Sequence, residues 1–252
     1  MLGGRSPVRP ERVGIVVVYP RLLGLYGDRG NGIAVQHRAE ARGIPTSLVE
    51  VEPGDPIPEQ GDLYLVGGGE DRSMTAAARL LDAQAGLRRA VEAGAGCLAV
   101  CAGLQLLARE YVGHDGSVRP GLGLLDVTCG RLPGPRAVGE VVARSEIDGS
   151  ALLGFENHQG DAVLGPLARP LGVVAVGRGN GHDRLEGARQ GRVIGTYLHG
   201  PVLVRNPALA DWLLAQAVGH DLAPLADARV ERLRRERLRA APTLRARRLR
   251  RG

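Results

Sequence analysis

The sequence predicts an α/β fold with a mostly parallel central sheet flanked by helices, extended by antiparallel strands and followed by a basic C-terminal tail. The first observation behind this prediction is that short apolar runs recur along the chain with helical patterns between them. The second is the composition: 44% of the residues are hydrophobic but only 3% are aromatic, so Val, Leu, Ile and Ala must form the core. The third is the 38 glycines, which suit many tight strand–helix turns.

Strands and helices alternate in the first half of the chain. The expected strands are 12–18, 46–51, 62–66 and 97–100, and the expected helices are 31–42, 71–94 and a helix after residue 101. Such alternation with short connections favours parallel strands joined by right-handed crossovers. Ligands of these sheets bind beyond the carboxyl ends of the strands, so we expect the functional site at that edge.

Antiparallel strands are expected in the second half, where Gly, Pro and Asp turns separate apolar runs with little helix between them. The expected strands are 124–127, 138–143, 152–156, 173–176 and 192–198, and a helix over 206–218 follows them. We interpret residues 10–222 as one domain and residues 223–252 as an Arg-rich tail.

The net charge of +6 belongs to the tail. Residues 229–252 hold 11 arginines and two glutamates, which leaves the rest of the chain at −3. We expect a solvated or loosely helical extension, or a short amphipathic helix that packs on the domain or on a partner. A different class of function, binding to nucleic acid or to an anionic membrane surface, would also use this tail. The tail has no aromatic residue for base stacking, so we expect no nucleic-acid partner and keep peripheral membrane contact as a hypothesis.

Cysteine usage and hydropathy indicate a cytoplasmic protein. Three cysteines without a C-x-x-C pair argue against a disulfide scaffold and a structural zinc site. No signal-peptide core precedes the first strand, and no apolar run approaches the 18 residues of a membrane span. We expect no metal site, and we interpret Cys97 and Cys129 as core residues.

The third cysteine lies in the stretch AGCLAVCAGLQLLAR, residues 95–109. Cys101 stands where an apolar strand stops and a helical pattern begins, which is the arrangement of a nucleophile elbow. Ala102 and Gly103 keep such a tight turn sterically possible. The alternative interpretation is that Cys101 is a small buried hydrophobe, as most free cysteines are.

A cysteine nucleophile needs a base, because a free thiol has a pKa of about 8.5. His199 ends the apolar strand 193–198 and is the first candidate, and His158 is the rival. Three glycines, 67–69, follow another strand, and their backbone N–H groups are candidates for an oxyanion hole together with that of Ala102.

The ordered set of motifs resembles a known family. Cys-Ala-Gly-Leu-Gln after an apolar strand, Gly-Gly-Gly-Glu-Asp before a helix and a strand-terminal histidine are similar to class I (triad-type) glutamine amidotransferases. The segments LYGDRGN, RAVGE, FENH and YLHGP resemble the cobyric-acid-synthase-like branch, and within it the glutaminase subunits of lipid II isoglutaminyl synthases. The resemblance spans about residues 12–220.

The resemblance implies roles for individual residues. Cys101 would attack the side-chain amide carbon of L-glutamine to form a thioester, and His199 would shuttle the proton. Backbone N–H groups around Gly68 or Gly69 and of Ala102 would hold the oxyanion. Gln105 and Arg136 would grip the substrate, since an Arg can pair bidentately with the α-carboxylate.

The sequence departs from the triad pattern at one position. Pro201 stands two residues after the histidine, where triad enzymes carry a glutamate. We expect either that the Cys–His dyad works alone or that a carboxylate comes from elsewhere, with Glu156 or a partner subunit as the options. Our hypothesis favours the partner.

The resemblance also implies a partner. It would be a MurT-type, Mur-ligase-like subunit that forms a heterodimer with this chain, binds ATP and Mg²⁺, and uses the ammonia to amidate the D-glutamate of lipid II; no cofactor is expected in this chain. One alternative is an amidotransferase component acting on cobyric or cobyrinic acid, although such proteins usually carry an N-terminal synthetase domain and this sequence starts near the amidotransferase-like strand. Another is a cysteine hydrolase of the same fold.

Overall fold

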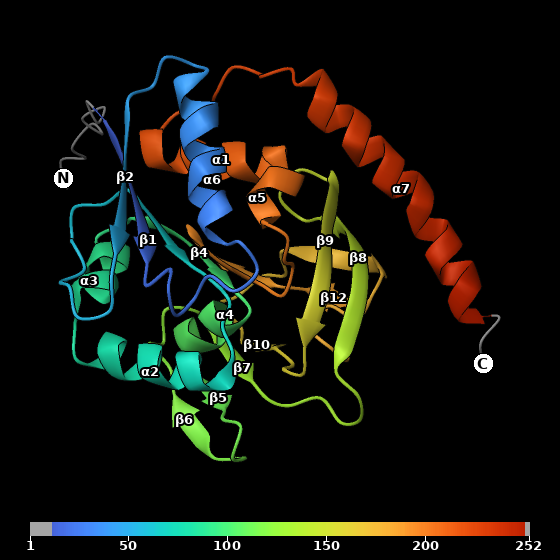
Figure 1. Cartoon of the computed structure of the whole chain (residues 1–252), viewed down its shortest axis with the longest axis horizontal. Coiled ribbons are helices and arrows are strands. Elements are labelled where there is room, and N and C mark those ends of the chain that lie inside the picture. Colours follow the sequence, from blue (N-terminus) through green and yellow to red (C-terminus); the bar gives the residue numbers. More distant parts are fainter. Residues whose placement is uncertain (1–11, 250–252) are drawn as a thin grey trace.

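The computed structural model describes residues 12–249, and a six-stranded sheet forms its centre (Figure 1). The strand order is β13-β14-β4-β3-β1-β2, and β13 alone runs antiparallel to its neighbour. The bounds are β1 Val13–Val18, β2 Thr46–Val51, β3 Leu63–Val66, β4 Gly96–Val100, β13 Ala188–Gln190 and β14 Val193–Thr196. This arrangement confirms the predicted mostly parallel sheet and its antiparallel extension.

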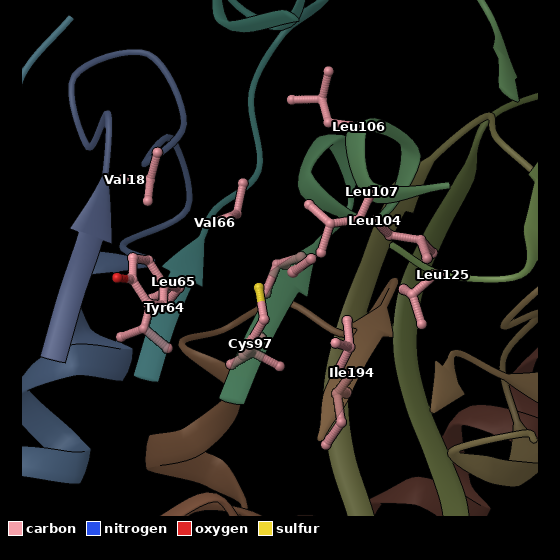
Figure 2. Packing of buried hydrophobic residues seen from close by; sticks show 14 of the residues in the cluster. Val18, Tyr64, Leu65, Val66, Cys97, Leu104, Leu106, Leu107, Leu125 and Ile194 are labelled. Carbon is pink, nitrogen blue, oxygen red and sulfur yellow. The ribbon is translucent and has the colours of Figure 1, made fainter. Parts of the chain in front are cut away.

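Helices cover both faces of the central sheet, so its inner strands are buried on both sides. Helices α1 (Arg29–Glu40) and α6 (Pro207–Val218) lie on one face, and α2 (Asp71–Asp82) and α4 (Ala102–Leu107) lie on the other (Figure 1). Continuous apolar strands such as β3 are typical of this burial. Figure 2 shows Cys97 among the side chains of this core, where it is fully buried, as is Cys129.

The single helix expected over 71–94 is wrong. The chain forms α2 and then α3 (Gly86–Glu92), with a break between them. At the break, the Gln84 side chain accepts a hydrogen bond from the Ile57 N–H and donates to the Asp55 carbonyl. A Cβ on Gly86 would lie 2.3 Å from the Ile57 carbonyl oxygen, so the loop before β3 presses directly on this point. Helical periodicity alone does not reveal such a tertiary contact.

The remaining strands form two further four-stranded sheets rather than joining the central one. One contains β5 Glu110–Val112, β6 Val118–Pro120, β7 Val127–Cys129 and β10 Val163–Leu164, and the other contains β8 Ala137–Ser145, β9 Ala151–His158, β11 Gly172–Val176 and β12 Leu185–Glu186. The strand expected over 124–127 is wrong except for its last residue. The N–H groups of Leu124 and Leu125 instead donate to the Leu107 carbonyl at the end of α4.

The tail forms a long helix, α7 (Ala228–Leu249), after the short helix α5 (Val202–Arg205) and α6. Figure 1 shows α7 along the outside of the molecule beside β8 and β9. Asp227 begins the helix, because its side chain accepts hydrogen bonds from the N–H groups of Arg229 and Val230. Residues 10–11 of the predicted domain and 250–252 of the predicted tail lie outside the described residues. Over residues 12–249, no helix is long and apolar enough to cross a bilayer.

Candidate active site

Three strand ends converge at the carboxyl edge of the central sheet. Strand β4 pairs with β3 on one side and with β14 on the other, with Ala99 opposite Val66 and Val100 opposite Thr196. Cys101 directly follows β4, the glycine loop 67–69 directly follows β3, and His199 comes three residues after β14. The topology therefore places the predicted nucleophile between the predicted oxyanion loop and the predicted base.

Cys101 has the backbone geometry of a nucleophile elbow. Its φ of 53° and ψ of −105° are unusual for a residue with a side chain, and α4 starts at the next residue. A Cβ on Gly103 would lie 2.4 Å from the Val66 carbonyl oxygen, so only glycine fits this close approach of α4 to β3. The Cys101 side chain is largely buried, with 9% of the residue exposed.

His199 is fully buried and held by aromatic neighbours. Its ring stacks on Phe155, with centroids 5.2 Å apart, and meets the Tyr26 ring edge-on at 4.7 Å. Nδ1 lies 3.2 Å from the Phe155 carbonyl oxygen. Because a carbonyl only accepts, Nδ1 carries the proton and Nε2 keeps its lone pair. Nε2 has no hydrogen-bond partner among the described residues.

Cys101 and His199 face the same point beside Gly68. A Cβ atom built on Gly68 would lie 3.4 Å from Cys101 Cβ and 3.7 Å from His199 Nε2. The space is open because residue 68 has no side chain. The nucleophile, the lone pair of the base and the glycine loop thus border one small region.

Burial keeps both members of the pair uncharged. It raises the pKa of the Cys101 thiol to about 12, although the Ala102 N–H acts in the opposite direction. Burial also lowers the pKa of His199 to about 4. At neutral pH the pair is therefore a thiol beside a neutral imidazole, and the free Nε2 lone pair is the group able to accept the thiol proton.

Asp28 binds one of the backbone N–H groups that are candidates for the oxyanion hole. Its Oδ2 accepts a hydrogen bond of 2.8 Å from the Gly68 N–H, which is therefore engaged in this structure. Gly69 and Ala102 supply the other two predicted N–H groups. Asp28 is 3% exposed, its Oδ1 has no partner among the described residues, and burial raises its pKa to about 6. Nothing in the sequence around the Asp of the motif LYGDRGN indicates that it contacts a residue 40 positions away.

Arg136 and Gln105 line the same cavity as Cys101, together with Glu70, Arg119 and Arg131 among others. Arg136 donates from Nε to Asn157 Oδ1 at 2.6 Å and from Nη2 to the Asn157 carbonyl at 2.9 Å. Asn157 in turn donates to the Tyr26 hydroxyl at 2.7 Å. Tyr26 packs against His199, so Tyr26 and Asn157 connect the predicted substrate arginine to the predicted base.

Glu156 and His158 form a buried pair, and His158 also lines the cavity that Cys101 borders. Glu156 accepts hydrogen bonds from the N–H groups of Arg178 and Gly179, and its Oε2 lies 3.7 Å from His158 Nε2. His158 Nδ1 is engaged by the Gly160 carbonyl at 2.7 Å. These contacts hold Glu156 beside His158 rather than beside His199, whose Nδ1 partner is the Phe155 carbonyl.

Comparisons with known proteins show the family of the chain. Residues 14–207 match the CobB/CobQ-like glutamine amidotransferase domain. The chain is 37% identical over 198 residues to the lipid II isoglutaminyl synthase subunit GatD of Staphylococcus aureus, covering 77% of this chain and 80% of that protein. It is 32% identical to GatD of Streptococcus pneumoniae, covering 83% and 82%. A cobyric acid synthase of Methylobacterium nodulans is 38% identical over 79% of this chain but only 40% of its own length.

Solved structures share the fold. A glutamine amidotransferase superposes with a TM-score of 0.56 at 24% identity, covering 80% of this chain and 98% of that one. The glutaminase domain of Trypanosoma brucei CTPS superposes with a TM-score of 0.53 at 12% identity, covering 84% and 96%. The chain therefore belongs to the CobB/CobQ-like family of glutamine amidotransferases and is a glutamine-hydrolysing enzyme.

Proposed function

We propose that this chain is the glutaminase subunit of a lipid II isoglutaminyl synthase. The observation that carries the proposal is the convergence of Cys101 and the free Nε2 of His199 on one point beside the glycine loop. The chain is similar to two GatD subunits over about four-fifths of the length of each of those proteins, whereas it matches only 40% of the length of a cobyric acid synthase. This difference in coverage supports the GatD-like role over a role in cobyric acid synthesis.

The proposed reaction has two halves that regenerate the enzyme. His199 Nε2 accepts the Cys101 proton as Sγ attacks the side-chain carbonyl carbon of L-glutamine, and the oxyanion forms near the Gly69 and Ala102 N–H groups. The C–N bond then breaks, the proton passes to the leaving ammonia, and a glutamyl thioester remains on Cys101. Water attacks the thioester, His199 takes its proton, and glutamate leaves as Sγ is protonated again.

Substrate binding is assigned to the cavity beside Cys101. The Arg136 guanidinium is exposed there and positively charged, and we propose that it pairs with the glutamine α-carboxylate. Gln105 lines the same cavity from α4, one turn after the elbow, and is the candidate for a hydrogen bond to the glutamine. The contact between Arg136 and Asn157 holds the guanidinium in place.

The subunit role requires a second protein. We propose a MurT-type, Mur-ligase-like partner that binds ATP and Mg²⁺ and delivers the ammonia to the D-glutamate of lipid II. A thiol with a pKa near 12 and an imidazole with a pKa near 4 make a poorly activated pair in the isolated chain. A carboxylate from the partner near His199 would favour its protonated form and so favour thiolate formation.

The test measures ammonia release from L-glutamine by the wild type and by Cys101→Ser, each alone and co-expressed with the Mur-ligase-like partner. We expect activity that depends on Cys101 and rises at least about tenfold with the partner, since removing or adding a general acid–base contribution changes rates by this much or more. In the complex, ATP-dependent amidation of lipid II should follow. Equal activity of the isolated subunit and the complex would contradict completion by the partner, and amidation of cobyric acid instead of lipid II would contradict the assigned acceptor.

A further inference from the structure

One arginine of helix α7 makes several hydrogen bonds to the body of the protein. Arg234 Nη2 donates to the Ala151 carbonyl at 2.7 Å, and its Nη1 donates to Asn206 Oδ1 at 3.1 Å and to the Arg205 carbonyl. Its neighbours Arg232 and Arg235 are exposed, so Arg234 is distinguished from the other arginines of this helix by its contacts. A planar guanidinium with three oxygen acceptors fixes both the position and the rotation of the helix.

The acceptors of Arg234 lie at a junction of three elements. Ala151 begins β9, Arg205 ends α5, and Asn206 lies between α5 and α6. The Asn206 side chain is fully buried and bonds to both the N–H and the carbonyl of Leu153 in β9. The junction is therefore rigid, and α7 is attached to it.

Arg205 links this junction to the turn that follows His199. Its Nε donates to the Gly200 carbonyl at 3.1 Å, and its guanidinium carbon lies 5.5 Å from the centre of the Phe155 ring. A Cβ on Gly200, whose φ is +140°, would lie only 2.6 Å from Arg205 Nε. The arginine is thus packed directly against the backbone of residue 200.

A second contact from α7 is linked to Arg205 through Glu140. Arg205 Nη1 lies 3.4 Å from Glu140 Oε2, and Arg237 of α7 lies 3.5 Å from Glu140 Oε1. Helix α7 is therefore connected to Arg205 in two ways: Arg234 donates to its backbone carbonyl, and Arg237 pairs with Glu140, the carboxylate that also pairs with the Arg205 side chain.

The two groups that Arg205 contacts also hold His199. Gly200 is the next residue in the chain, and Phe155 stacks on the imidazole and accepts from its Nδ1. We propose that α7 is a brace for His199 and that Arg205 is the positioning residue through which it acts. The inference rests on the catalytic role proposed for His199. In this proposal the Arg-rich tail acts within the enzyme, and this role does not depend on binding to an anionic surface.

The matched pair Arg234→Ala and Arg232→Ala tests the brace in the full-length chain co-expressed with the Mur-ligase-like partner. Arg232 lies in the same helix, and its only ion pair among the described residues is with Glu236, at 4.0 Å. We expect Arg234→Ala to lower kcat for glutamine hydrolysis about tenfold, because a small misplacement of a catalytic group has effects of this size or larger. KM should stay unchanged because Arg136 and Gln105 are untouched, and Arg232→Ala should resemble the wild type. Arg234→Lys, which keeps a cation and fewer donors, should restore part of kcat.

A readout without activity separates this proposal from the proposed function. The imidazole NMR signals of His199, assigned by their loss in His199→Gln, should shift in Arg234→Ala and not in Arg232→Ala. If Arg234→Ala does not fold, Glu140→Gln replaces it and should shift the same signals. A lower melting temperature with unchanged kcat and unchanged His199 signals would overturn the brace. Absence of glutamine hydrolysis in the wild-type complex would overturn the proposed function, while the NMR comparison would still decide on the brace.

Discussion

Cys101 and His199 lie side by side but are held by different kinds of structure. Cys101 is fixed by its own segment, a buried strand followed by a short helix, and by the close approach of Gly103 to β3. His199 lies beyond the end of its strand and is fixed by side chains of other segments: Tyr26 and Phe155, which are remote in sequence, and, through Gly200, Arg205 of α5. The central sheet and its own helix thus place the nucleophile, whereas the base also depends on Phe155 of the antiparallel strand β9 and on the Tyr26 and Arg205 side chains.

Because of this difference, we expect the nucleophile and the base to respond differently to substitutions in their surroundings. The elbow depends on steric fit, so a single added methyl group should disturb it. The histidine depends on stacking, a carbonyl acceptor and the contacts of Arg205, so its orientation can be altered from a distance without unfolding the core. A partner protein can act on the second kind of support more readily than on the first.

Replacing each of two buried histidines, His199 and His158, with glutamine gives the largest expected difference, and it concerns kcat. His199→Gln removes the base whose unpartnered Nε2 borders the same point beside Gly68 as Cys101, and we expect kcat for glutamine hydrolysis to fall about 10³-fold. His158→Gln alters a ring whose Nδ1 is engaged by the Gly160 carbonyl and whose Nε2 lies 3.7 Å from Glu156 Oε2, and kcat should fall less than about tenfold. Steady-state ammonia release from L-glutamine, measured for both variants in the complex, tests which histidine is the base. A larger loss in His158→Gln would reverse the assignment of the base.

The steric requirement of the elbow is tested by Gly103→Ala. The new Cβ would lie 2.4 Å from the Val66 carbonyl oxygen, so α4 must move away from β3, and we expect a loss of about 3 kcal/mol in the free energy of unfolding. Gly14→Ala is the control, because a Cβ there finds only ordinary contacts from 3.5 Å. Urea denaturation measures both variants. Similar stabilities for the two would refute the steric account.

The smallest expected effect concerns Asp28 and its dependence on pH. Because burial raises the pKa of Asp28 to about 6 from 3.8, the folded state holds its proton more tightly than the unfolded state. The wild type should therefore lose stability as the pH rises through about 4 to 6, by about 2–3 kcal/mol. Asp28→Asn keeps an oxygen acceptor for the Gly68 N–H but cannot ionise, so its stability should not fall over that interval. Parallel unfolding curves of the two proteins at pH 4.5 and 8 would contradict this prediction.

Much of the parallel half follows from the sequence because its signals are local. The strand at 46–51 was predicted with its observed bounds, and the elbow is visible as a cysteine between an apolar run and a helical pattern. A helix break depends on what packs against it, and the contacts of Gln84 and Gly86 with the loop before β3 have no local sequence signature.

The surroundings of His199 illustrate what a sequence does not contain. A histidine at a strand end is recognisable, but the carbonyl that sets its tautomer belongs to Phe155, 44 residues earlier. Asp28 reaches Gly68 across 40 residues, and Arg234 reaches Ala151 across 83. The charge of the tail is evident in the sequence, whereas the role of Arg234 among its 11 arginines depends on the path of α7.

The most direct test of the central claim is to trap the glutamyl thioester on Cys101. The wild-type complex is mixed with L-glutamine, quenched in acid within milliseconds to seconds, digested and analysed by mass spectrometry. Our account predicts that the peptide containing Cys101 gains the mass of one glutamyl group in the wild type, gains more of it in His199→Gln if thioester hydrolysis slows more than its formation, and gains none in Cys101→Ser. Rapid ammonia release by the wild type without any adduct on this peptide, and with Cys101→Ser fully active, would contradict the account.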